Sequence, residues 1–241
     1  MDIEEILNVN LFERKSYRYF LPLLSYLSVV VALSFVFLIV PDEEVMGAVQ
    51  RIFYFHVASA FTSYALIAVL LVASSFYLTT KKLTWDILAE SAASIGLIFC
   101  SIVLVTGMIW GHSAWNTWWR WEPRLVSSLA LWLLLLSYSL LRSYVTDNIL
   151  YRSYSAVLAI VTAVFVPVVI FSIKIMNQNE QLHPQVLAKQ GLTVSSYKYA
   201  LLVSTLALLI TATWLMLVKI GNLLLEYEIF QLNINLQKRE G

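Results

Sequence analysis

The sequence contains few charged residues. Only 13% of its 241 residues are Asp, Glu, Lys or Arg, roughly half the share that is usual in a soluble domain. Six long windows contain no charged residue at all: 19–41, 52–80, 91–119, 125–141, 153–173 and 199–218. A helix needs roughly 20 residues to cross a bilayer, whereas the helices of a soluble all-α protein would carry polar stripes. The sequence therefore predicts an all-α membrane protein, a six-transmembrane-helix bundle.

Several functional motifs are absent. The single cysteine, Cys100, cannot form an internal disulfide, and the lack of Cys-x-x-Cys-His argues against a c-type cytochrome. Without Gly-x-x-x-x-Gly-Lys-Ser/Thr the chain does not hydrolyse ATP by the P-loop route. No charged residue lies in the middle of a predicted span, which argues against a proton pump or an ion-coupled carrier. We therefore expect a protein that is not an enzyme.

The basic residues are distributed unevenly between the two sides of the predicted bundle. With six spans both termini lie on one side, which collects ten of the sixteen Lys and Arg residues, against six on the other. Loops rich in Lys and Arg stay in the cytoplasm, so we expect both termini to be cytoplasmic. The first apolar run ends at Pro41 without a small-residue cleavage site, so we expect it to be a retained span rather than a signal peptide.

Tryptophan, in contrast, is abundant in one short stretch. Five of the eight tryptophans fall between residues 110 and 124: Trp110, Trp115, Trp118, Trp119 and Trp121. Tryptophans often anchor helices at the membrane surface, but this density exceeds what anchoring requires. Arg120, Glu122 and Arg124 lie in the same stretch. A flat aromatic surface edged by arginines suits a planar apolar ligand with acidic groups, such as haem with its propionates; the alternatives are an interfacial belt and an ion pair of the arginines with Glu122.

The spacing within this stretch predicts its local structure. Trp115, Trp118, Trp119 and Glu122 are spaced i, i+3, i+4 and i+7, which predicts a short helix along the outer membrane surface. Pro123 disfavours a helical conformation of the residue before it and suits the first position of a helix. We therefore expect a break at Glu122 and a fourth span that carries Arg124 in its first turn. Residues 223–236 are apolar enough either to extend the last helix or to rest on the inner surface.

The three histidines, His56, His112 and His183, all fall on the outer side of the predicted topology. Imidazole is a common axial ligand of haem iron, and His56 and His183 lie in different loops, so they can hold a planar ligand between them. His112 can bond a propionate, act as an alternative ligand or do neither. Each histidine is also consistent with an ordinary polar residue at the interface. Arg51, near His56, is a further candidate for contact with a propionate.

Several short motifs together resemble a known family. They are Phe53-Tyr54-Phe55-His56-Val57, Thr106-Gly107, Trp110-Gly111, Trp115-Asn-Thr-Trp118-Trp119-Arg-Trp121, Arg124-Leu125 and Leu182-His183. Over nearly its whole length the chain resembles the haem-handling protein family of cytochrome c biogenesis, and within it the haem exporter protein C (CcmC) family. The resemblance implies that His56 and His183 are the axial ligands of a haem b and that the tryptophan-rich loop, about residues 110–124, holds the porphyrin. The chain departs from the family in having Glu122 in place of Asp, followed by Pro123, and in the residues on both sides of His183.

The resemblance also implies a function. A single transmembrane domain, residues 1–241, would bind haem on the outer, periplasmic face of the bacterial inner membrane. It would deliver that haem to a periplasmic haem chaperone during c-type cytochrome maturation, beside the subunits of an ABC transporter and in contact with membrane lipid but no nucleic acid. Two alternatives remain open at this point: a haem–apocytochrome c ligase subunit of the second biogenesis system, and a non-haem membrane scaffold.

Overall fold

The computed structural model describes residues 15–44, 46–144, 149–172, 174 and 194–240. Six long α-helices make up most of this part: α2 (Lys15–Ser34), α3 (Arg51–Thr80), α4 (Leu83–Trp115), α5 (Pro123–Tyr144), α6 (Ile149–Ser172) and α7 (Ser195–Glu240). A π-helical turn, η1 (Phe35–Ile39), follows α2, and a 3-10 turn, η2 (Ala48–Gln50), precedes α3. Each long helix contains a stretch that is long and apolar enough to cross a membrane. The predicted six-span helical bundle is confirmed.

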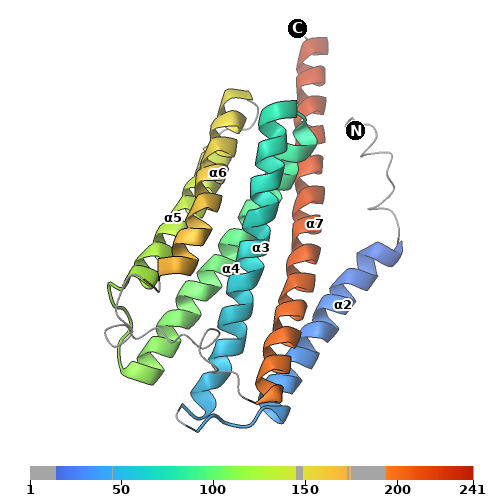
Figure 1. Ribbon diagram of the computed structural model, residues 1–241. Helices are drawn as coiled ribbons and strands as arrows, with labels where there is room; N and C mark the ends of the chain where they lie inside the picture. Colours follow the sequence, from blue (N-terminus) through green and yellow to red (C-terminus); the bar gives the residue numbers. More distant parts are fainter. Residues whose placement is uncertain (1–14, 45, 145–148, 173, 175–193, 241) are drawn as a thin grey trace.

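The helices form one elongated bundle with α3 near its centre. In Figure 1, α5 and α6 lie at one side, α3 and α4 in the middle, and α7 and then α2 at the other side. Half of the most apolar window of α3 is buried, against 17% of that of α2, because α3 packs against α4, α6 and α7 whereas α2 packs mainly against α7. Side chains of α3 are therefore well placed to contact several other helices.

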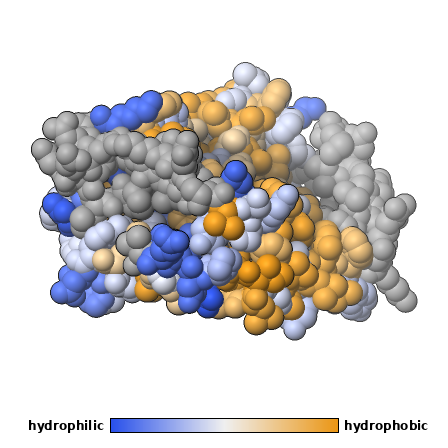
Figure 2. All heavy atoms as spheres, turned by 60° about the horizontal axis from the view of Figure 1, so that its bottom comes forward, coloured by the Kyte–Doolittle hydropathy of each residue, from blue (hydrophilic) through white to orange (hydrophobic). Residues whose placement is uncertain are grey.

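Small side chains bring α3 and α4 close together. Ala73 of α3 and Ala89, Ala92 and Ala93 of α4 are almost completely buried in the main core cluster, and small residues let membrane helices approach closely. The outward faces carry large apolar side chains instead, such as Leu38, which is 82% exposed. Figure 2 shows broad hydrophobic areas over one face of the molecule. Exposed apolar surface of this extent is expected of helices that face lipid.

The prediction of a short helix over residues 115–122 is wrong. The chain leaves α4 at Asn116, which adopts a left-handed conformation with φ 53° and ψ 36°, and its N–H bonds the carbonyl of His112. This geometry ends a helix. Residues 117–122 are not helical, and the segment turns back so closely that a Cβ added at Gly111 would lie 3.0 Å from the carbonyl oxygen of Thr117. The predicted start of the fourth span at Pro123 is confirmed.

The structure decides the conformation of residues 223–236, which continue α7 as a helix. Its 46 residues make it about 69 Å long at 1.5 Å per residue, more than twice the hydrocarbon core. Leu223 and Leu224 pack against Ile87 of α4, and beyond this contact α7 extends past the other helices (Figure 1).

An ion cluster that the sequence analysis missed lies at the end of the bundle opposite the tryptophan-rich segment. Arg142 near the end of α5 donates hydrogen bonds of 3.0 and 2.8 Å to the two carboxylate oxygens of Asp86 on α4. It also bonds Glu90 at 2.9 Å through Nε, and Arg152 of α6 lies 3.5 Å from Asp86. Asp86 is 3% exposed, so these charge-assisted bonds satisfy a carboxylate that would otherwise be costly to bury.

A candidate ligand pocket beside the tryptophan-rich segment

A pocket lies between α3, α4, the start of α5 and the segment 116–122. Its empty space, counting the part that is open to solvent, is about 810 Å³. Its lining comprises His56, Ala60, Tyr64, Val103, Leu104, Gly107, Met108, Trp110, Gly111, Trp115, Thr117, Trp118, Trp119, Arg120, Glu122, Arg124, Leu125 and Ser128. Aromatic and aliphatic side chains dominate this lining, and most of the polar groups come from the segment and from α5.

His56 enters the pocket from the second turn of α3. His56, Ala60 and Tyr64 line the pocket together because residues four apart lie on one face of a helix. The imidazole Nδ1 lies 3.0 Å from Oγ1 of Thr106 on α4. The ring also lies against Gly107, where an added Cβ would be 3.2 Å from Cε1 of His56. Two consecutive residues of α4 therefore hold one edge of this imidazole.

The prediction that the tryptophans form one flat surface is wrong. Trp110 is only 4% exposed, and it packs edge-on against Phe53 of α3 at 6.1 Å. Its ring is tilted by 48° to that of Trp115. The difference arises because Trp110 lies on α4 and turns toward α3 and the bundle core, whereas the segment that carries the later tryptophans lies beyond the end of α4. The rings therefore surround the pocket at different angles.

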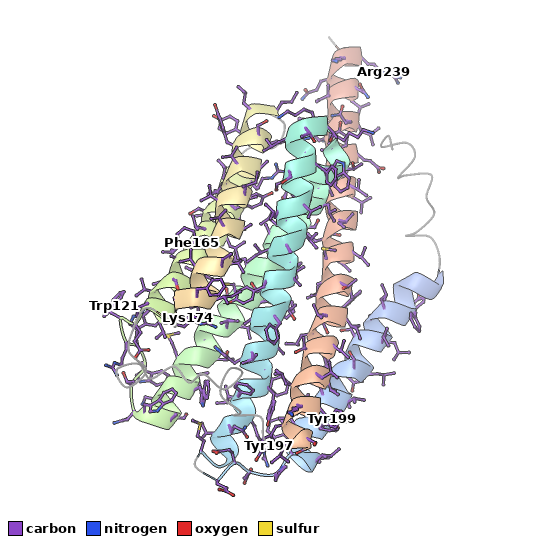
Figure 3. The ribbon with its side chains drawn as sticks, in the orientation of Figure 1. Trp121, Phe165, Lys174, Tyr197, Tyr199 and Arg239 are labelled. Carbon is purple, nitrogen blue, oxygen red and sulfur yellow. The ribbon has the colours of Figure 1, made fainter. Side chains whose placement is uncertain are left out.

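The other three tryptophans lie on the non-helical segment. Trp118 packs on His112 with 4.1 Å between ring centroids, and Trp119 meets Trp121 edge to face at 5.8 Å. Trp121 is 78% exposed, does not line the pocket, and lies at the same side of the molecule as Lys174 in the view of Figure 3. The indole N–H groups of Trp110 and Trp119 are buried without a hydrogen-bond partner in the described part of the chain.

The three candidate arginines have different surroundings. Arg124 lines the pocket, and its Nη1 donates hydrogen bonds to the carbonyl oxygens of Val169 and Ile170 at the end of α6. Arg120 also lines the pocket and lies 3.6 Å from Glu122, so the ion pair that the sequence analysis left open is present. Arg51 pairs instead with Asp42 at 2.8 Å and does not line the pocket.

The structure brings seven of the predicted site residues to this pocket: His56, Trp110, Trp115, Trp118, Trp119, Arg120 and Arg124. Trp121, Arg51 and His112 are not part of its lining. His183 lies outside the described residues. Tyr64, Thr106 and Gly107 were not among the predicted site residues. Tyr64 lies eight residues after His56 on the same helix, and this spacing is the signal in the sequence that adds it to the site.

The fold and the pocket define the class of protein: a multi-pass helical membrane protein with an aromatic, histidine-containing pocket at one end of its bundle. Residues 7–235 match the family model described as Heme exporter protein C, so the chain belongs to this family.

Relatives with the same name align with just over half of the chain. The chain is 33% identical to Heme exporter protein C of Paracoccus denitrificans (strain Pd 1222) over 138 residues, 57% of each chain. It is 35% identical to that of Bradyrhizobium diazoefficiens over 58% of this chain and 54% of the relative. It is 31% identical to that of Escherichia coli (strain K12) over 58% of each. The chain thus spans somewhat more than half the length of these curated relatives.

Proposed function

We propose that this protein binds haem b in the aromatic pocket and delivers it to a periplasmic haem chaperone during c-type cytochrome maturation. The observation that carries the proposal is the placement of His56 among aromatic rings in a pocket at one end of the bundle. Haem is here the cargo of the protein. The family to which the chain belongs and its relatives, named for heme export, support the same function.

The residues around the pocket fit haem chemically. An imidazole can ligate the iron, and the indole rings of Trp110, Trp115, Trp118 and Trp119 offer apolar faces and edges to a porphyrin. The buried indole N–H groups of Trp110 and Trp119, which have no partner in the described part of the chain, are donors that can meet the acidic groups of a ligand. Burying such donors is unfavourable unless they form a hydrogen bond, so a ligand with acceptors stabilises the pocket.

We assign the proposed roles as follows. His56 is one axial ligand, and His183, which matches the family through the motif Leu182-His183 although its neighbours differ, is the second. Arg120, which is half exposed, gives up its contact with Glu122 and pairs with a propionate instead. The main role of Arg124 is to hold α5 against the end of α6 through its hydrogen bonds to Val169 and Ile170. Contact of Arg124 with a propionate is secondary to that role. The carbonyl contacts of Arg124 and the ion pair of Arg51 make both arginines weaker propionate partners than Arg120.

The proposal includes a location and partners. We place the pocket on the periplasmic face of the bacterial inner membrane, with both termini in the cytoplasm, because ten of the sixteen basic residues then lie on the cytoplasmic side. We take residues 1–241 to act as one unit that contacts lipid, the haem chaperone and the subunits of an ABC transporter. The lack of a nucleotide-binding motif in the sequence is consistent with ATP hydrolysis by such a partner.

A visible absorption spectrum tests the proposal. We expect the protein, purified in detergent from haem-replete cells, to show a Soret band and the α and β bands of a six-coordinate haem b. Titration of the haem-depleted protein with haemin should restore the same spectrum with one haem per chain. A protein that neither carries haem nor binds haemin would instead be a membrane scaffold whose tryptophans act as anchors.

A further inference from the structure

The hydroxyl group of Thr106 lies between two polar groups of different helices. Its Oγ1 is 2.6 Å from the carbonyl oxygen of Ile102, one turn earlier on α4, and 3.0 Å from Nδ1 of His56 on α3. The first contact is common, because threonine in a helix often bonds the carbonyl four residues before it. The second contact joins residues that are 50 positions apart, and it therefore depends on how α3 and α4 pack.

These two contacts indicate which nitrogen of His56 carries the proton, because they constrain where the hydroxyl hydrogen of Thr106 points. A threonine hydroxyl has one hydrogen, and a carbonyl oxygen can only accept, so the short contact to Ile102 uses that hydrogen. Oγ1 then has only lone pairs to offer Nδ1, and the imidazole must donate its own Nδ1–H. A neutral imidazole that is protonated at Nδ1 has a free lone pair at Nε2, and this nitrogen is then the one available to a metal.

Gly107 complements this arrangement by letting the imidazole lie against α4. A Cβ at this position would lie 3.2 Å from Cε1 and 3.7 Å from Nδ1 of His56. The shorter distance is tighter than an ordinary carbon–carbon contact of about 3.5–4.0 Å, so a side chain at this position would require the ring to shift by a few tenths of an ångström.

We propose that Thr106 is a positioning residue for the proposed haem ligand: it accepts the Nδ1–H of His56, fixes the orientation of the ring and leaves Nε2 free for the iron. This inference rests on the proposed function, since it assumes that His56 ligates haem. A hydrogen bond from the second nitrogen of a ligating histidine raises the basicity of the first, and loss of such a partner typically lowers metal affinity about 10- to 100-fold. Thr106 thereby tunes the strength of the iron–His56 bond without touching the haem.

Three variants of one position test this role. Thr106→Val keeps the shape of the side chain and removes the acceptor, Thr106→Ala removes the acceptor with a smaller side chain, and Thr106→Ser keeps the hydroxyl. Thr205→Val is the matched control, because Thr205 of α7 makes the same bond to the carbonyl four residues before it and does not line the pocket. The measurements are the haemin dissociation constant, the reduction potential of the bound haem and the thermal midpoint of the haem-depleted protein.

We expect Thr106→Val and Thr106→Ala to raise the haemin dissociation constant about 10-fold or more and to shift the reduction potential upward, because a less basic ligand stabilises ferric iron less. Thr106→Ser should restore both values, and Thr205→Val should leave both unchanged. If Thr106→Val and Thr106→Ala both keep the affinity and potential of the wild type, or if Thr106→Ser behaves as they do, the inference is wrong. Two other outcomes would contradict the proposed function itself: a wild-type protein that binds no haemin, and a His56→Gly variant that keeps the wild-type spectrum.

Discussion

The guanidinium group of Arg124 in the first turn of α5 donates a 2.8 Å hydrogen bond to the carbonyl oxygen of Val169 in the last turn of α6. The last carbonyls of a helix have no backbone N–H partner within it. The Val169 carbonyl accepts from the Ser172 hydroxyl as well as from Arg124, and a cation there also offsets the negative end of the helix dipole. Arg124, which lines the pocket from α5, thus also bonds the C-terminal end of the neighbouring helix, α6. The lining of the pocket and the packing of α5 on α6 are thereby coupled through one side chain.

This coupling predicts a stability effect. We expect Arg124→Gln to lower the free energy of unfolding by at most about 1.5–3 kcal/mol, the range for a hydrogen bond with a charged partner, even without haem, because the contact with Val169 is partly buried. Arg120→Gln should have a smaller effect on stability, since Arg120 is half exposed and its contact with the buried Glu122 is 3.6 Å long. Thermal unfolding of the two haem-depleted variants in detergent measures both effects on stability. Equal midpoints for the two variants would show that the contact with α6 does not stabilise the bundle.

A second prediction separates the pocket tryptophans from the exposed one. Replacing Trp118 and Trp119 by Ala should lower haem occupancy and transfer to the chaperone, because aromatic contacts contribute of order 1 kcal/mol per ring beyond simple burial. Trp121→Ala is the control, since Trp121 lies on the same segment but not in the pocket lining. Membrane insertion should be normal in all variants. Wild-type haem content in the double variant would reduce Trp118 and Trp119 to interfacial anchors.

The histidines are predicted to differ in their response to imidazole. His56→Gly and His183→Gly should each lose chaperone loading, shift the spectrum toward a five-coordinate form and regain a six-coordinate spectrum with added imidazole, which occupies the open ligand position. His112→Gly should keep the wild-type spectrum, because His112 packs on Trp118 and is not part of the pocket lining. A wild-type spectrum in His183→Gly together with a changed one in His112→Gly would assign the ligands to His56 and His112 instead.

The proposed topology is tested with reporter fusions. Ten of sixteen basic residues on one side and the positive-inside rule predict that a reporter active only in the periplasm is active after residue 115 or 185. The same reporter should be silent at residue 241, and a cytoplasmic reporter should give the opposite pattern. Periplasmic activity at residue 241 would place the pocket on the cytoplasmic side and overturn the proposed direction of haem delivery.

The ion cluster at the other end of the bundle should matter for stability alone. Arg142→Met removes the bidentate partner of Asp86, which is 3% exposed, and leaves that carboxylate beside the partly buried Glu90 with the longer contact of 3.5 Å to Arg152. Breaking such a pair typically costs about 3–5 kcal/mol. We therefore expect a large drop in the thermal midpoint, while the protein that remains folded keeps the wild-type haem spectrum. A normal midpoint with an altered spectrum would instead link this end of the bundle to the pocket.

The sequence by itself determined the features that depend on composition and on neighbouring residues. Six uncharged windows are sufficient to predict six spans, because a charge in the hydrocarbon core is unfavourable wherever the helix packs. Pro123 predicts the start of α5 for a local reason, its fixed φ and missing N–H. The density of tryptophan around residue 115 and the position of His56 indicated an aromatic site with a histidine, and the structure places seven of the predicted residues around one pocket.

Only the tertiary structure decided which of these side chains face one another. The helical spacing of Trp115, Trp118 and Trp119 failed as a guide because Asn116 turns left-handed and the segment folds back on Gly111. Arg124 and Val169 meet because α5 packs on α6, and Thr106 reaches His56 across 50 positions of the chain. Contacts of this kind arise from the packing of whole helices, and the periodicity of a single helix carries no information about which partner its face will meet.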